Sequence, residues 1–260
     1  MRMLTDSLRG LGVGTAPKAL IAHGVNTTVL ELDPLVHRYA IDYFGLPNNH
    51  TAILTDAISW VRDVAYDQIE LYKPWLGRSS PLTQQYDYII YDVFTGGASP
   101  LALFTLESLA ALKVLLNEHG VVAINYAGDI TSEPMRNVLR TIDHVFIERC
   151  RAFREMPATT SAANEGDMLN AVVFCAKSDK MWPFSFRDPG EADYLGSKSR
   201  ARFLAPKKEL EFVLPASGDE HIELVWDSNK DKWKGEQRRA GRRHWKLMRD
   251  MIPAVVWENW

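Results

Sequence analysis

The fold is decided by the stretch that begins with Gly10-Leu11-Gly12-Val13-Gly14-Thr15 and ends with Leu30-Glu31-Leu32-Asp33-Pro34. The glycines come directly before a predicted helix at 15–24, and glycine lets a tight turn and a ligand approach each other closely. The amino end of that helix presents unpaired N–H groups. Glu31 lies 21 residues after Gly10, where nucleotide-binding sheets place an acidic residue that binds ribose hydroxyls. The stretch therefore predicts a nucleoside site in a parallel sheet.

Helices and short apolar strands alternate from this stretch to residue 177, which is typical of a parallel sheet covered by helices on both faces. Predicted strands cover 27–32, 51–54, 86–91, 120–126, 144–148 and 171–175. Predicted helices cover 15–24, 34–45, 57–71 and 100–116, and a further helix starts at Ser132. We expect an α/β domain of three layers, a Rossmann-like fold, at 1–177. The remaining residues, 178–260, are expected to form an extension that packs back on it, with a hairpin between 211–214 and 222–226.

Acidic residues close three successive predicted strands. Glu31 is followed by Asp56 and Asp92, and ligands of open parallel sheets bind beyond the carboxyl ends of the strands. Asp33 points to the same crevice by its spacing, although capping the helix that starts at Pro34 is its preferred role. Several carboxylates repel a pyrophosphate and favour a nucleoside that carries positive charge, such as a sulfonium. Thr15 stands where a dinucleotide motif has glycine, which disfavours an NAD-dependent enzyme.

Composition points to an ordinary soluble protein. The formal net charge of −3 gives the whole molecule no attraction to nucleic acid or anionic membrane. No stretch reaches the roughly 18 consecutive apolar residues of a membrane span, and the first residues lack the apolar core of a signal peptide. Cys150 and Cys175 are read as two semi-buried thiols in a reducing compartment, so a cytoplasmic location is expected. The histidines lack ligand spacing, and no metal is assigned.

At these residues the chain resembles the polyamine synthase family, meaning spermidine and spermine synthases, within the class I S-adenosylmethionine-dependent methyltransferase superfamily. The likeness covers 10–177 and includes Thr55-Asp56-Ala57 and Tyr86-Asp87-Tyr88-Ile89-Ile90-Tyr91-Asp92-Val93-Phe94. It implies a mostly parallel sheet with an antiparallel final strand. It implies S-adenosylmethionine, or its decarboxylated form, as donor and a small-molecule amine as acceptor. The residues that it assigns to the donor are Gly10, Gly12, Gly14, Thr15, Glu31, Asp33, Asp56 and Ala57.

Within this resemblance Glu31 would bind the ribose and Asp56 the adenine amino group. Asp92 matches the aspartate that helps to deprotonate the attacking amine. An alkylammonium has a pKa near ~10 and must lose a proton before it attacks the carbon beside the sulfonium. Asp92 is therefore the predicted catalytic residue.

The chain also departs from the synthase pattern. Thr95 replaces the second aspartate that grips the polyamine, and the chain begins at the glycine loop without the β-rich domain of the synthases. Methyl transfer is therefore favoured, with aminopropyl transfer as the first alternative and a non-catalytic nucleoside-binding module as the second. Asp6, Ser7 and Arg9 are unusual for a central strand. Either that strand is short and irregular, or the chain is a shortened form of a longer protein.

The remaining features favour structural roles. Trp60 could stack on adenine but is expected in the core. Residues 230–249 are rich in arginine and lysine, which favours the solvated face of an amphipathic helix over an RNA-binding surface. Nucleic acid is therefore not an expected partner, and a homodimer stays an open alternative.

Overall fold

The computed structural model describes residues 4–8, 11–71, 85–92, 100–129, 132–155, 168–216 and 222–251. In this part of the chain one sheet has the strand order β3-β2-β1-β4-β5-β7-β6-β8. The strands are β1 (Leu4–Leu8), β2 (Thr27–Glu31), β3 (Thr51–Leu54), β4 (Tyr86–Asp92), β5 (Leu116–Asp129), β6 (Cys150–Arg154), β7 (Met168–Ala176) and β8 (Glu211–Phe212). The pairs from β3 to β5 are parallel, whereas β7 is antiparallel to both β5 and β6. The expected sheet with an antiparallel final strand is confirmed.

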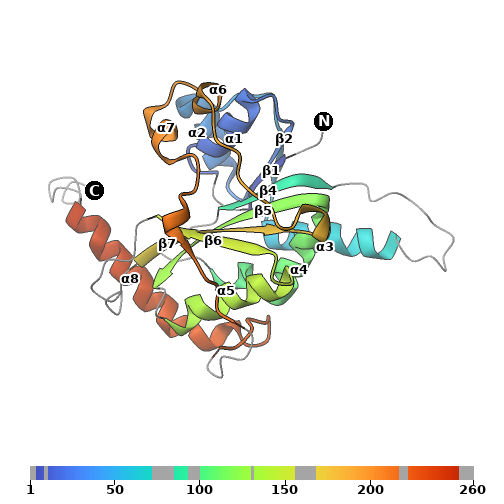
Figure 1. Ribbon diagram of the computed structural model, residues 1–260, viewed down its shortest axis with the longest axis vertical. Coiled ribbons are helices and arrows are strands. Elements are labelled where there is room, and N and C mark those ends of the chain that lie inside the picture. Colours follow the sequence, from blue (N-terminus) through green and yellow to red (C-terminus); the bar gives the residue numbers. More distant parts are fainter. Residues whose placement is uncertain are drawn as a thin grey trace.

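Helices cover both faces of the sheet, so the molecule has three layers (Figure 1). They are α1 (Thr15–Ala22), α2 (Pro34–Phe44), α3 (Ala57–Leu71), α4 (Leu106–Leu115), α5 (Glu133–Val145), α6 (Glu191–Tyr194), α7 (Lys198–Phe203) and α8 (Lys234–Met251). Figure 1 shows α1 and α2 on one face, with α6 and α7 beside them, and α3, α4 and α5 on the other. The α/β class and the three layers are thus as the sequence predicts.

Side-chain caps fix where the helices begin. Asp33 accepts a hydrogen bond from the Leu35 N–H at the start of α2, which ends at Gly45 in the left-handed conformation. Ser132 caps α5 in the same way. The predicted helix at 100–116 is wrong at both ends: a 3-10 turn covers Leu101–Leu103, Thr105 caps α4, and β5 already begins at Leu116. A threonine N-cap holds the chain extended before a helix, so the turn and α4 are separate.

The core lies between the sheet and the α3–α4–α5 layer. Val122, Ile124 and Tyr126 alternate along β5 toward this layer and are almost fully buried, as the two-residue period of a strand requires. Phe104 contacts both Tyr91 and Tyr126 edge to face. Trp60 is partly buried against this core, as expected. The core therefore packs against one face of the sheet and holds β4 and β5 in place.

The first strand is present and irregular. β1 pairs in parallel with β2 on one side and β4 on the other, and its register with β2 shifts between Asp6 and Leu8. The short and irregular strand of the first explanation is therefore present, and the second explanation, a shortened form of a longer protein, stays a prediction.

Two strand predictions are wrong. Residues 144–148 form the end of α5 and a turn in which Ile147 and Glu148 have φ angles of 58° and 57°. The strand begins after this turn, at Cys150. The hairpin is also absent from the described residues, because β8 pairs with Ala152 and Phe153 of β6 while 222–226 forms no strand.

The cysteines are a further correction. Cys150 and Cys175 face each other on the antiparallel strands β6 and β7, with their Cα atoms 4.1 Å apart, and form a disulfide. The sequence gives no sign of this pairing because the two residues are 25 positions apart and one strand was placed wrongly. Because both cysteines are in the disulfide, free thiols no longer support the expectation of a reducing compartment.

Residues of the C-terminal region complete the main core. Val225 and Trp233 are 0% and 2% exposed and belong to the same cluster as the residues of β5 and α5. The Val225 N–H donates to Thr141 Oγ1, and the indole N–H of Trp233 donates to Glu133 Oε1. The division into 1–177 and 178–260 stays a prediction.

We predict that Trp233→Ala lowers the free energy of unfolding by about 3–5 kcal/mol, because it leaves a large cavity in the core. Chemical denaturation followed by circular dichroism measures this. Trp226→Ala is the matched control, since Trp226 is 40% exposed, and it should cost less than about 1 kcal/mol. Equal losses in the two variants would contradict the assigned core position of Trp233.

Candidate functional site

The candidate site lies at the carboxyl ends of four neighbouring strands. In the order β3-β2-β1-β4, Glu31 ends β2, Asp92 ends β4, and Asp56 follows β3 by two residues. Thr55 N–H donates to the Glu31 carbonyl, so the Asp56 segment stays beside the end of β2. The three predicted carboxylates therefore occur on one edge of the sheet, on both sides of β1.

Glu31 is held by the backbone around it. Its side chain is buried and accepts a hydrogen bond from the Leu11 N–H at 3.2 Å and another from the Asp33 N–H at 2.9 Å. Each bond uses a different carboxylate oxygen. Since a carboxylate has about four lone-pair sites, Glu31 can fix the glycine turn and still accept hydrogen bonds from two hydroxyls.

The glycine turn has the conformation that its sequence predicts. Gly12 and Gly14 have φ angles of 50° and 74°, which glycine adopts without strain. A Cβ atom on Gly14 would lie 3.4 Å from Leu46, which is ordinary contact, so the positive φ rather than a lack of space favours glycine at this position. Thr15 is the exposed first residue of α1. Gly10 lies outside the described residues.

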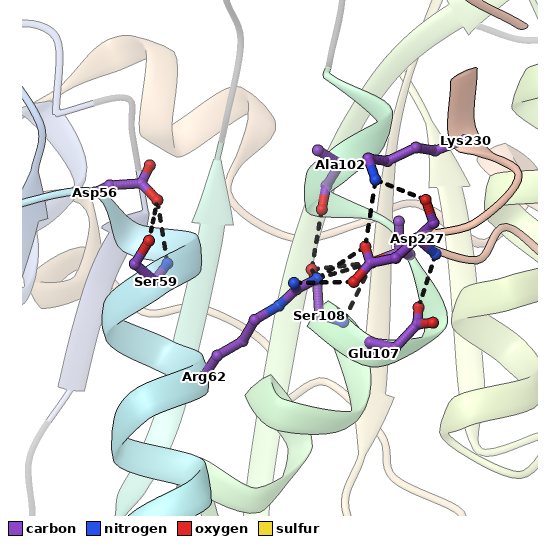
Figure 2. Close-up of polar contacts among 9 residues, drawn as sticks. Asp56, Ser59, Arg62, Ala102, Glu107, Ser108, Asp227 and Lys230 are labelled. Carbon is purple, nitrogen blue, oxygen red and sulfur yellow. Dashed lines mark hydrogen bonds and ion pairs between the residues drawn. The ribbon is translucent and has the colours of Figure 1, made fainter.

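The other predicted donor residues have structural roles of their own. Asp33 caps α2. Asp56 Oδ2 accepts hydrogen bonds from both the N–H and the hydroxyl of Ser59 in the first turn of α3 (Figure 2). Ala57 is fully buried in the core. A role in binding a donor is therefore additional for Asp33 and Asp56, and the methyl group of Ala57 already packs against protein.

Asp92 has a partner that the sequence analysis missed. Asn125 lies opposite Asp92 on β5, and its amide Nδ2 donates to Asp92 Oδ1 at 2.7 Å. Only the register of β4 against β5 brings the two together. Thr95, the residue that departs from the synthase pattern, lies outside the described residues.

A second polar cluster fastens the C-terminal region to α3 and α4 (Figure 2). The guanidinium of Arg62 on α3 contacts both carboxylate oxygens of Asp227, at 2.9 and 3.0 Å, and donates to Ser108 Oγ at 2.6 Å. The Asp227 N–H donates to Glu107 Oε2. Arg62 lies on the helix that Asp56 caps, so this cluster fixes the helix beside the candidate site.

The chemistry of the strand ends fits an adenosyl donor. Carboxylates on neighbouring strands attract a sulfonium, and Glu31 keeps lone pairs for a ribose while the glycine turn lies against it.

No helix among the described residues is long and apolar enough to cross a membrane.

Comparisons with known proteins agree with this geometry. The chain is 43% identical over 258 residues to an N-terminal histidine N-methyltransferase of Emericella nidulans. The match covers 96% of this chain and 43% of that protein. Among solved structures, a probable spermidine synthase from Corynebacterium glutamicum has a TM-score of 0.52 and 18% identity, covering 75% of this chain and 63% of the other. Human methyltransferase-like protein 13 in complex with SAH has a TM-score of 0.50 and 18% identity, covering 75% and 77%. No model of a protein family matches the chain.

Asp227 gives the attachment of the C-terminal region a pH dependence. Burial raises the pKa of Asp227, but hydrogen bonds with Arg62 and Thr105 and the charges of Arg62 and Lys230 outweigh it, so the pKa lies below the ordinary 3.8. The stabilisation is therefore present above pH 3.8 and is lost as the pH falls through the lower folded-state value.

We predict that the stability difference between the wild type and Asp227→Asn shrinks as the pH falls below the ordinary aspartate pKa of 3.8. Urea denaturation at a series of pH values between neutrality and strong acid measures it. Asp231→Asn is the control, because Asp231 pairs with Lys234 while 63% exposed. A difference that stays constant with pH would show that the charge of Asp227 contributes nothing.

Proposed function

We infer that this chain, which has the Rossmann-like fold of the class I S-adenosylmethionine-dependent methyltransferases, transfers a methyl group to a nitrogen of an N-terminal histidine. The observation that carries this proposal is 43% identity, over 96% of the chain, to an enzyme with that name. A fold likeness alone would not select a reaction.

The length of the relative limits how much of its activity can be assigned to this chain. The chain spans 43% of the N-terminal histidine N-methyltransferase, so the activity of that whole protein is proposed for this chain rather than established. The aligned part contains the glycine turn, Glu31 and Asp92, which are the features that the proposed methyl transfer would use. These residues support assigning the transfer step to this region.

The donor residues follow from the contacts described above. S-adenosylmethionine supplies a methyl group on a positively charged sulfur. Glu31 would accept hydrogen bonds from its ribose hydroxyls, and Asp56 would accept one from the adenine amino group. The turn at Gly12 and Gly14 would place backbone beside the donor without a Cβ in the way. A cationic donor also reduces the repulsion among the three carboxylates.

Asp92 would act on the acceptor nitrogen. An α-ammonium group has a pKa of about 8 and has no lone pair until it loses a proton. A carboxylate within hydrogen-bond reach holds this proton and orients the nitrogen toward the methyl carbon. Asn125 keeps the Asp92 side chain in one orientation through the 2.7 Å bond. The new N–C bond then forms as the C–S bond breaks, and the two partners need only be held in line.

Aminopropyl transfer is the weaker alternative. The likeness to a spermidine synthase is 18% in sequence and supports the fold alone. A polyamine aminopropyltransferase of Vibrio vulnificus is 32% identical over 120 residues, which are 45% of this chain and 35% of that protein, so decarboxylated S-adenosylmethionine has less support as donor than S-adenosylmethionine.

We predict that Glu31→Ala weakens the binding of S-adenosylmethionine by about 1–3 kcal/mol, the cost of losing hydrogen bonds to a charged group. Isothermal titration calorimetry measures it. Asp42→Ala is the control, because Asp42 is an exposed carboxylate that pairs with Arg38 on the surface of α2. If both variants bind the donor as the wild type does, the ribose is held elsewhere. If even the wild type gives no heat, the chain has no working donor site.

For Asp92→Asn we predict nearly unchanged donor binding and loss of methyl transfer. The assay follows labelled methyl from S-adenosylmethionine into a synthetic peptide that begins with histidine. Asp87→Asn is the matched control, since Asp87 lies on the same strand and accepts a hydrogen bond from Asn117 away from the site. Wild-type turnover in Asp92→Asn would remove Asp92 from the catalytic role.

A further inference from the structure

One acceptor atom beside Asp92 lacks a donor. Asn125 uses its amide nitrogen to hold Asp92, and its Oδ1 is buried with no hydrogen-bond partner in the described part of the chain. A buried carbonyl without a donor is costly, and such atoms in native proteins call for an explanation. A ligand that brings an N–H group to this position would satisfy the atom.

The strand register leads from this atom to a cavity. Asp92 pairs with Asn125, Asn125 with Val172 on β7, and Val172 with Phe153 on β6. Residues paired in this way point to the same face of a sheet. The four side chains therefore form one row across the sheet, on the face opposite the core.

The far end of this row is the wall of a cavity of about 740 Å³, whose lining is mainly apolar surface and also includes Arg154, Glu155, Arg202, Lys207 and Glu209. Val172, Phe153 and Phe174 line it from the sheet, and Phe203, Leu204 and Leu210 line it from the C-terminal region. Phe203 and Leu204 are 68% and 44% exposed. Large apolar side chains around an open cavity favour an apolar occupant.

We propose that this cavity binds the side chains of the third and fourth residues of a peptide whose amino-terminal residue lies at Asp92 and Asn125. The proposal rests on the proposed methyl transfer and narrows its acceptor from an N-terminal histidine to a histidine that begins an extended peptide of at least four residues. The N–H groups of the terminal residue meet Asp92 and the free Oδ1 of Asn125, and apolar residues further along the peptide enter the cavity.

Distances support this assignment. Neighbouring strands are about 4.8 Å apart, so from a point midway between Asp92 and Asn125 the row reaches Val172 after roughly 7 Å and Phe153 after roughly 12 Å. An extended peptide advances about 3.3–3.6 Å per residue, which places its third residue about 7 Å and its fourth about 10 Å from the first. The side chains of the third and fourth residues therefore reach the cavity, whereas a free amine or a dipeptide does not.

The experiment compares synthetic peptides that begin with histidine, in a methyl-transfer assay with the full 260-residue chain. One peptide has two residues, one has five with leucine at positions 3 and 4, and one has five with serine at those positions. We expect KM to be at least about tenfold lower for the leucine peptide than for the other two, the effect of burying one apolar side chain. The double variant Phe203→Ala/Leu204→Ala should erase this preference and leave turnover of the dipeptide unchanged.

Val213→Ala is the matched control, because Val213 is 93% exposed and does not line this cavity. It should keep the preference for leucine. Equal KM values for the three peptides, or a preference that survives Phe203→Ala/Leu204→Ala, would overturn the proposed cavity while the methyl transfer itself stands.

If no peptide is methylated, the proposed function fails and binding alone decides the cavity. Fluorescence anisotropy of labelled peptides then measures affinity with no chemical step. Tighter binding of the leucine peptide, lost in Phe203→Ala/Leu204→Ala, would support the cavity. Equal binding of the leucine and serine peptides would reject it.

Discussion

The two hydrogen bonds to the Glu31 carboxylate connect the end of β2 with two neighbouring segments. One bond joins the glycine turn before α1, and the other joins the residue that caps α2. Because a buried carboxylate is costly unless hydrogen bonds satisfy it, Glu31 and the backbone N–H groups of Leu11 and Asp33 fix one another. The site edge is thus organised before any donor binds. These bonds hold the Glu31 carboxylate in one position. A fixed position is what the proposed recognition of two ribose hydroxyls requires.

Local sequence signals predicted most of the first half of the fold. Asp33-Pro34 and Gly45 mark both ends of α2, and Ser132 marks the start of α5, because caps and glycine turns act within a few residues. The strand-end carboxylates could be found for the same reason, since each follows a short apolar run. Predicting that they share one edge required only the rule that parallel strands end together.

Features that depend on register could not be predicted in this way. Asn125 becomes a partner of Asp92 only through the alignment of β4 with β5, and the Cys150–Cys175 disulfide only through that of β6 with β7. The segment around Ile147 and Glu148 predicts a strand although it forms a turn, because the composition of an apolar segment with β-branched residues fits either assignment. The short strand β8 pairs with β6, through residues 58 and 60 positions apart in sequence, rather than with a neighbour in the chain. For Asn125, the disulfide and β8, the deciding contact lies 25 or more positions away in sequence.

The attachment of residues 223–227 has a consequence for how this chain can vary between relatives. Asn137 Oδ1 and Thr141 Oγ1 accept hydrogen bonds from the backbone N–H groups of Glu223 and Val225, and Leu106 N–H donates to the Val225 carbonyl. Backbone groups are the same whatever the side chain, so these hydrogen bonds do not depend on which side chains occupy the segment 223–227. These backbone bonds constrain the receiving side chains of α5, whereas Val225 and Asp227 are constrained separately by burial and by the ion pair with Arg62. Homologous chains should therefore keep an amide at 137 and a hydroxyl at 141 even where other residues of the segment 223–227 differ.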